Sequence, residues 1–217
     1  MNPPRICRLL LTAFCMTGGL ISGAAIGRPG VLSSSIAATA ATPQGLIEGL
    51  HGALIEVMRD AKRLGPKGRF DKLRQPVVST LDLEGMLKIA VGDYWAQASA
   101  AEREKLLAAF RDYSVSSFAS RFDGYSGERF ETLGTAPGPR GTVLVRTRIL
   151  GPSTDPVPIT YVVRQSADEW HVIDILLEAG ISELATRRSE YRAILKDGGM
   201  AELAAVLEQK ARNLTAP

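Results

Sequence analysis

Cysteine and histidine are scarce in this chain of 217 residues. Both cysteines, Cys7 and Cys15, lie near the start, and the two histidines are His51 and His171. Residues 41–217 can therefore form no disulfide, no thiolate metal site and no cysteine nucleophile. Two histidines are too few for a histidine-rich metal site, and no carboxylates stand at ligand-like spacing around them. The sequence predicts no metal and no other cofactor.

Nucleotide-binding motifs and an excess of positive charge are also lacking. No G-x-G-x-x-G follows a predicted strand, and no G-x-x-x-x-G-K-[ST] occurs. The whole chain has 26 Lys and Arg against 23 Asp and Glu, but three of the arginines precede residue 41. The remaining chain is neutral at pH 7, whereas a phosphate backbone is bound by a basic surface. Nucleic acid is therefore not an expected partner.

Charge is absent from residues 9–27, which follow Arg5 and Arg8. A basic start, an apolar stretch and the sequence Ala38-Thr39-Ala40 are typical of an export signal with its cleavage site. The stretch approaches the length of a transmembrane helix but is diluted by glycine, serine and threonine, so a cleaved signal is favoured over a retained inner-membrane anchor. Residues 1–40 are predicted to be signal or anchor plus linker, and residues 41–217 a single domain delivered to the periplasm.

Helical periodicity dominates the first half of the predicted domain. Apolar residues recur every three or four positions within 46–61, after Thr42-Pro43 and before Gly65-Pro66, which predicts an amphipathic helix. A short segment is expected to end at Pro76, and another helix follows Asp82. Ser99 and Glu102 form a capping box before a long helix that ends near Phe122.

After Gly124 the pattern changes to short runs of β-branched and aromatic residues between Gly, Pro and Asp turns. Alternation places one apolar face on the middle strands, and we expect the helices 46–61 and 106–122 to cover it. Two more helices are expected after Ser182, separated by Asp197-Gly198-Gly199. The predicted fold is therefore α+β, with a curved four-stranded antiparallel sheet covered by amphipathic helices and followed by two C-terminal helices. The four predicted strands are 128–133, 142–150, 157–165 and 170–177.

Asp174 interrupts an otherwise apolar strand, and a buried carboxylate needs a partner. We expect a structural role, either an ion pair with Arg187 or Arg188 or a cap bond to the following helix. The alternative is a general base of raised pKa in a cavity. His171 and Asp174 are three residues apart in a strand and should point to opposite faces, which disfavours a Ser-His-Asp triad. For Arg187, an exposed pair with Glu183 is a further option.

Three linked segments resemble the C-terminal part of the MlaC/toluene-tolerance family. They are Trp170–Asp174, Glu178–Ser182 and Arg187–Tyr191, which are similar to the family's tryptophan-led strand ending in aspartate, its Gly-x-Ser turn and its Arg-x-x-aromatic helix. Similar residues within 81–113 extend the resemblance over nearly the whole domain, and the substitutions in 181–188 are similar to the hopanoid-associated HpnM branch. The resemblance implies an NTF2-like or MlaC-like fold. It also implies a carrier that shields a lipid between the inner and outer membranes and delivers it to a membrane-bound lipid transport complex.

A lipid carrier requires an apolar cavity and no catalytic group. A chain of about 16 methylenes would cost about 13 kcal/mol in water if no protein covered it. We therefore predict a monomeric, non-enzymatic carrier of a hopanoid or a phospholipid. The alternatives are a small cavity enzyme with Asp174 as general base and a non-catalytic assembly subunit whose apolar face is core. The predicted lipid-binding residues are Leu107, Phe110, Phe118, Phe122, Val143, Val145, Ile159, Tyr161, Val163, Ile173 and Ile175.

Overall fold

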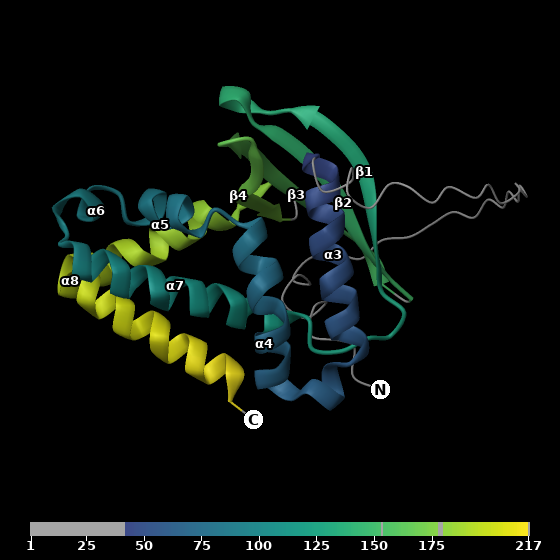
Figure 1. Cartoon of the computed structure of the whole chain (residues 1–217), viewed down its shortest axis with the longest axis horizontal. Coiled ribbons are helices and arrows are strands. Elements are labelled where there is room, and N and C mark those ends of the chain that lie inside the picture. The colour runs from purple at the N-terminus through teal and green to yellow at the C-terminus, as the bar shows by residue number, and fades with distance from the viewer. Residues whose placement is uncertain (1–41, 153, 178–179, 217) are drawn as a thin grey trace, which may run out of the picture.

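The computed structural model describes residues 42–152, 154–177 and 180–216 (Figure 1). The predicted signal or anchor and its cleavage motif lie outside the described residues. Within the described part of the chain, no helix is both long enough and apolar enough to span a bilayer.

Helix α3 (Pro43–Arg59) begins where the sequence predicts, because Thr42 Oγ1 accepts a hydrogen bond from Gly45 N at 3.0 Å. It ends earlier than expected, and α4 (Ala61–Thr80) follows after Asp60. Gly65 departs from helical geometry with φ 63°, so the expected stop is a kink within α4. The expected end at Pro76 is wrong, since α4 continues through this proline for another turn.

The central helices are α5 (Leu83–Val91), α6 (Asp93–Gln97) and α7 (Ala100–Arg121). The predicted capping box starts α7: Glu102 N donates to Ser99 Oγ at 3.3 Å, and Ser99 N donates to Glu102 Oε2 at 2.8 Å. The last helix, α8 (Glu183–Thr215), leaves helical geometry at Gly199 with φ 65°. The two expected C-terminal helices are therefore two arms of α8 on either side of this break.

The sheet has five strands in the order β1-β2-β3-β4-β5, and each neighbouring pair is antiparallel. The expected meander is confirmed, but the count of four is wrong. The fifth strand has two residues, which is too short to show alternation in the sequence. It forms because the chain turns at Gly180 and pairs with the end of β4 before α8 begins. The strands are β1 (Arg129–Pro137), β2 (Val143–Gly151), β3 (Thr154–Ser166), β4 (Glu169–Leu177) and β5 (Ile181–Ser182).

Helix α3 lies across the inner face of the sheet, whereas α5, α7 and α8 extend to the other side of the molecule (Figure 1). The expected cover by α3 is confirmed, but the expected cover by α7 is wrong. Both arms of α8 pack beside α7, since Arg187 and Lys210 each lie over the Tyr113 ring. The apolar residues of α7 are therefore used mainly in contacts between helices, and Phe122 at its end reaches the β1 residue Phe130.

Candidate functional site

The inner face of the sheet, which α3 covers, is apolar and buried. Val145 and Val163 are 0% exposed, and Tyr161 is 2% exposed. Val145 lies opposite Tyr161, which places side chains of β2 and β3 side by side on one face. The α3 residues that share this core with the strands are Ile47, Leu50, Leu54, Val57 and Met58. A ligand that used this face would have to separate α3 from the sheet.

One polar pair lies inside this apolar interface. His51 Nε2 of α3 is 3.0 Å from Tyr161 Oη of β3, and the imidazole stacks on Phe130 with ring centroids 3.8 Å apart. Burial lowers the pKa of His51 to about 3, so the imidazole is neutral at pH 7. Burial also raises the pKa of Tyr161, which keeps its hydroxyl protonated. The pair can share a hydrogen bond with an uncharged polar group but provides no cation for a phosphate.

This pair was not predicted from the sequence, although the position of His51 indicates that its imidazole is buried. His51 follows Ile47 by four positions and precedes Leu54 by three, so it stands on the apolar stripe of the first helix. Its partner is 110 residues away in sequence. No local pattern indicates that contact.

The predicted lipid-binding residues fall into two groups. Val145, Ile159, Tyr161 and Val163 are buried on the sheet face, and Phe122 joins them through Phe130 at 6.1 Å between ring centroids. Phe110 lies elsewhere, because its ring packs edge-on against Tyr191 of α8 at 6.5 Å. Ile173 is the extra residue of a β-bulge, since Val172 and Asp174 pair with adjacent residues of β3. The remaining predicted residues, Leu107, Phe118, Val143 and Ile175, are half-buried.

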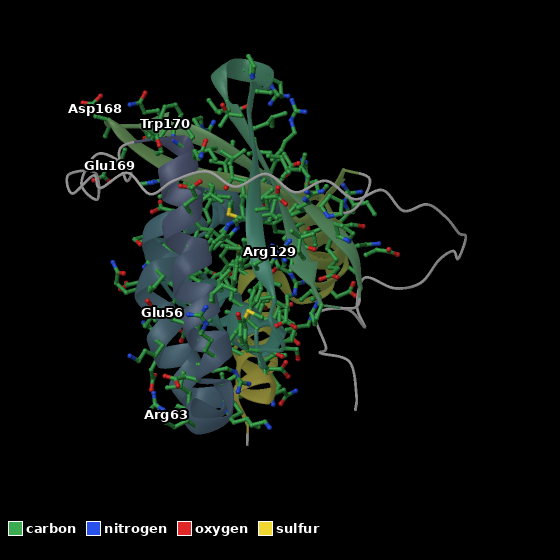
Figure 2. All side chains as sticks on the ribbon, turned by 90° about the vertical axis from the view of Figure 1, so that its right-hand side faces the viewer. Glu56, Arg63, Arg129, Asp168, Glu169 and Trp170 are labelled. Carbon is green, nitrogen blue, oxygen red and sulfur yellow. The ribbon has the colours of Figure 1, made fainter. Side chains whose placement is uncertain are left out.

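A pocket of about 390 Å³ opens at the N-terminal end of α3. Figure 2 shows Trp170 beside this end of α3, with Arg63 at the opposite end. Val143 lines the pocket and shares its strand face with the buried Val145, so the pocket borders the closed interface. Its size lies within the range of about 300–1,000 Å³ typical of small-molecule sites. The lining residues are Thr42, Pro43, Gln44, Gly45 and Glu48 from the start of α3 and Thr135, Val143 and Trp170 from the sheet.

A second pocket, of about 310 Å³, lies between α4, α7 and the end of α8. Its walls carry charges of both signs, among them Lys67, Asp112 and Glu208. None of the predicted lipid-binding residues lines it.

Asp174 holds the junction between β4 and α8. Its Oδ2 accepts from Ser182 Oγ at 2.6 Å, and its Oδ1 accepts from Leu184 N at 3.1 Å. The expected cap bond is therefore confirmed, and the alternative ion pair with Arg187 or Arg188 is wrong. Both carboxylate oxygens are used in holding this turn.

Two other expectations about neighbouring residues are also wrong. His171 and Asp174 lie on the same face of the sheet because of the β-bulge between them: they pair with Arg164 and Val162, which are two residues apart on β3. His171 Nδ1 instead lies 3.1 Å from the Trp170 carbonyl oxygen. The exposed pair of Arg187 with Glu183 does not form among the described residues.

Arg187 does not pair with Glu183 because its guanidinium lies against aromatic rings. Its guanidinium lies over the rings of Phe110 at 5.5 Å and Tyr113 at 5.2 Å, between α7 and α8. Glu183 is 3.6 Å from Arg121 instead. Arg188 is exposed. Arg187 therefore joins the two helices through cation–π contacts.

The model of the family described as "MlaC protein" matches residues 48–209, from the first turns of α3 to the last turns of α8. This chain belongs to the MlaC family. A solved structure of a phospholipid-binding protein from Ralstonia solanacearum, in complex with a phospholipid, is similar to this MlaC-family chain with a TM-score of 0.69 and 19% sequence identity. The similarity covers 80% of this chain and 98% of the Ralstonia chain. The two proteins therefore share one α+β fold.

Proposed function

We propose that this chain is a non-enzymatic lipid carrier that holds the apolar part of one membrane lipid between α3 and the sheet. The observation that carries the proposal is the continuous apolar face formed by Val145, Ile159 and Val163, with α3 laid across it. Membership of the MlaC family and a fold shared with a phospholipid-binding protein support it. The predicted lipid-binding residues on the sheet and Phe122 belong to this site.

The closed interface is consistent with a carrier that exists in empty and loaded forms. With no lipid, α3 and the sheet cover each other's apolar side chains, which keeps them out of water. With a lipid, each buried methylene contributes about 0.8 kcal/mol, and the acyl chain covers the apolar side chains that α3 and the sheet uncover as they separate. The net cost of opening is therefore much smaller than the total apolar area suggests.

The ligand is a phospholipid or a hopanoid. The bound phospholipid of the Ralstonia protein supports the first, and the residues 181–188 that are similar to the HpnM branch support the second. The neutral pair of His51 and Tyr161 suits an ester carbonyl or a hydroxyl, which both lipid classes can supply. We infer that the chain acts as a monomer in the periplasm, after export directed by residues 1–40. It would pass its lipid to a membrane-bound transport complex.

Mass spectrometry of lipids extracted from the purified protein tests this function. We expect one lipid class to co-purify at close to one molecule per chain, and a Val145→Trp variant to retain less of it. The matched control is Leu133→Trp, because Leu133 lies on β1 but is 53% exposed. A wild-type protein that carries no lipid and extracts none from vesicles would refute the proposal.

A further inference from the structure

The elements that cover the sheet are attached to it in different ways. Asp82 N, just before α5, donates to Val172 O of β4 at 2.9 Å, and Leu81 forms a β-bridge with the same residue. Helix α8 continues directly from β5, which pairs with β4, and Asp174 caps it. These helices cannot leave the sheet unless backbone hydrogen bonds break.

Helix α3 has a weaker attachment. Within the described part of the chain, Pro43–Arg59 form no backbone hydrogen bond with the strands. Their side-chain hydrogen bond to the sheet is the one between His51 and Tyr161, and the other contacts are apolar. A lipid chain can replace apolar contacts, since they are not directional. The His51–Tyr161 bond is therefore the specific contact that has to break when α3 moves.

The far end of α3 is built to allow such a movement. Helical geometry is interrupted at Asp60 and again at Gly65, five residues further on. Gly65 has φ 63°, a conformation that glycine adopts without strain, and a Cβ at this position would contact nothing within 4 Å. We therefore place the hinge of the movement at these two interruptions, at the C-terminal end of α3.

The N-terminal end of α3 is where the interface is already open. The pocket of about 390 Å³ is lined by Glu48 of α3 and Thr135 of β1, and its lining residue Val143 shares a strand face with the buried Val145. A chain that enters here meets Val143 first and the His51–Tyr161 bond deeper along α3. The pocket thus offers an entrance, and the hinge lies at the opposite end of the helix.

We propose that α3 is the gate of the lipid site, and that an acyl chain enters through this pocket and separates the helix from the sheet by breaking the His51–Tyr161 bond. This inference rests on the proposed carrier function. Once α3 has moved, His51 and Tyr161 both face the lipid and can hydrogen-bond its ester carbonyl or hydroxyl. The same pair latches the empty form and contacts the lipid in the loaded one.

A reversible cross-link tests the gate, because residues 42–216 contain no cysteine. In the full chain with Cys7→Ser and Cys15→Ser, Glu48→Cys and Thr135→Cys place exposed thiols on opposite walls of the pocket. A short bis-methanethiosulfonate joins them, and a reductant releases them. The matched control carries Arg74→Cys and Asp112→Cys, which replace a salt bridge of 3.0 Å between α4 and α7.

The measurement is uptake of pyrene-labelled phosphatidylglycerol from vesicles of phosphatidylethanolamine and phosphatidylglycerol. We expect the cross-linked gate to take up lipid slower by on the order of tenfold, the reduced protein to recover, and the cross-linked control to match wild type. Tyr161→Phe, which removes the latch hydroxyl, should accelerate uptake. Equal rates for the cross-linked gate and the cross-linked control would overturn the inference while leaving the carrier function intact. If wild type takes up no lipid, the carrier function itself fails, and the gate with it.

Discussion

Acidification should destabilise this protein through His51. The pKa of this buried imidazole is about 3 in the folded chain, against 6.5 for an unperturbed histidine. Between these two values the unfolded chain binds a proton that the folded chain does not, so the free energy of unfolding falls as the pH falls. The contribution is fully present above pH 6.5 and is lost progressively down to about pH 3.

The magnitude at pH 5 follows from the same values. The interval from pH 6.5 to pH 5 is worth about 2 kcal/mol, since one pH unit corresponds to about 1.4 kcal/mol in this window. The result does not depend on the exact folded pKa, because any value of about 4 or lower leaves His51 neutral at pH 5. A loss of this size is a large fraction of the stability of a typical domain, which is about 5–15 kcal/mol.

Urea unfolding at pH 7.5 and pH 5.0, followed by circular dichroism, measures this loss. Because carboxylates also titrate, wild type is compared with His51→Gln, whose amide can still bond Tyr161 but does not take up a proton. We expect wild type to lose about 2 kcal/mol more than His51→Gln over this interval. An equal loss in both proteins would refute the assignment of His51 as a buried neutral group.

Substitutions at three further positions have expected outcomes. Val145→Trp overpacks a closed face, so it should lower the free energy of unfolding by about 1–3 kcal/mol and reduce the lipid that co-purifies. Thermal melts and lipid analysis of one preparation check both effects, and an unchanged lipid content would contradict the proposed site. Asp174→Ala removes the acceptor for Ser182 and Leu184 and should lower the free energy of unfolding by about 1–3 kcal/mol, measured in urea. Asp174→Asn keeps one acceptor oxygen and should be less destabilising; a larger loss in Asp174→Asn than in Asp174→Ala would show that charge matters more than the cap. Ser99→Ala removes the capping box of α7 and should lower stability by about 1 kcal/mol, and no change in the urea midpoint would mean that tertiary contacts alone hold this helix start.

The sequence by itself determined most of the local structure. The starts of α3, α7 and α8 were predictable because Thr42, Ser99 and Ser182 bond backbone groups within three residues, so the signal is contained in a few adjacent letters. The β meander was predictable for the same reason, since alternation and turn residues act between near neighbours. A structural role for Asp174 followed from its place in an apolar strand, but the structure was needed to choose the cap bond over an ion pair. The family followed from linked segments near Asp174.

Only the tertiary structure decided which surfaces meet. An apolar stripe shows that a helix has a buried side but not which element covers that side. The packing of α7 against α8 could therefore not be predicted from the sequence. Phe110 and Phe122 belong to the same helical stretch, yet one faces Tyr191 and the other Phe130. The contact of His51 with Tyr161 spans 110 residues, and the shift in their pKa values comes from burial by residues of several elements. Periodicity carries no information about such contacts, because they depend on how the whole chain packs.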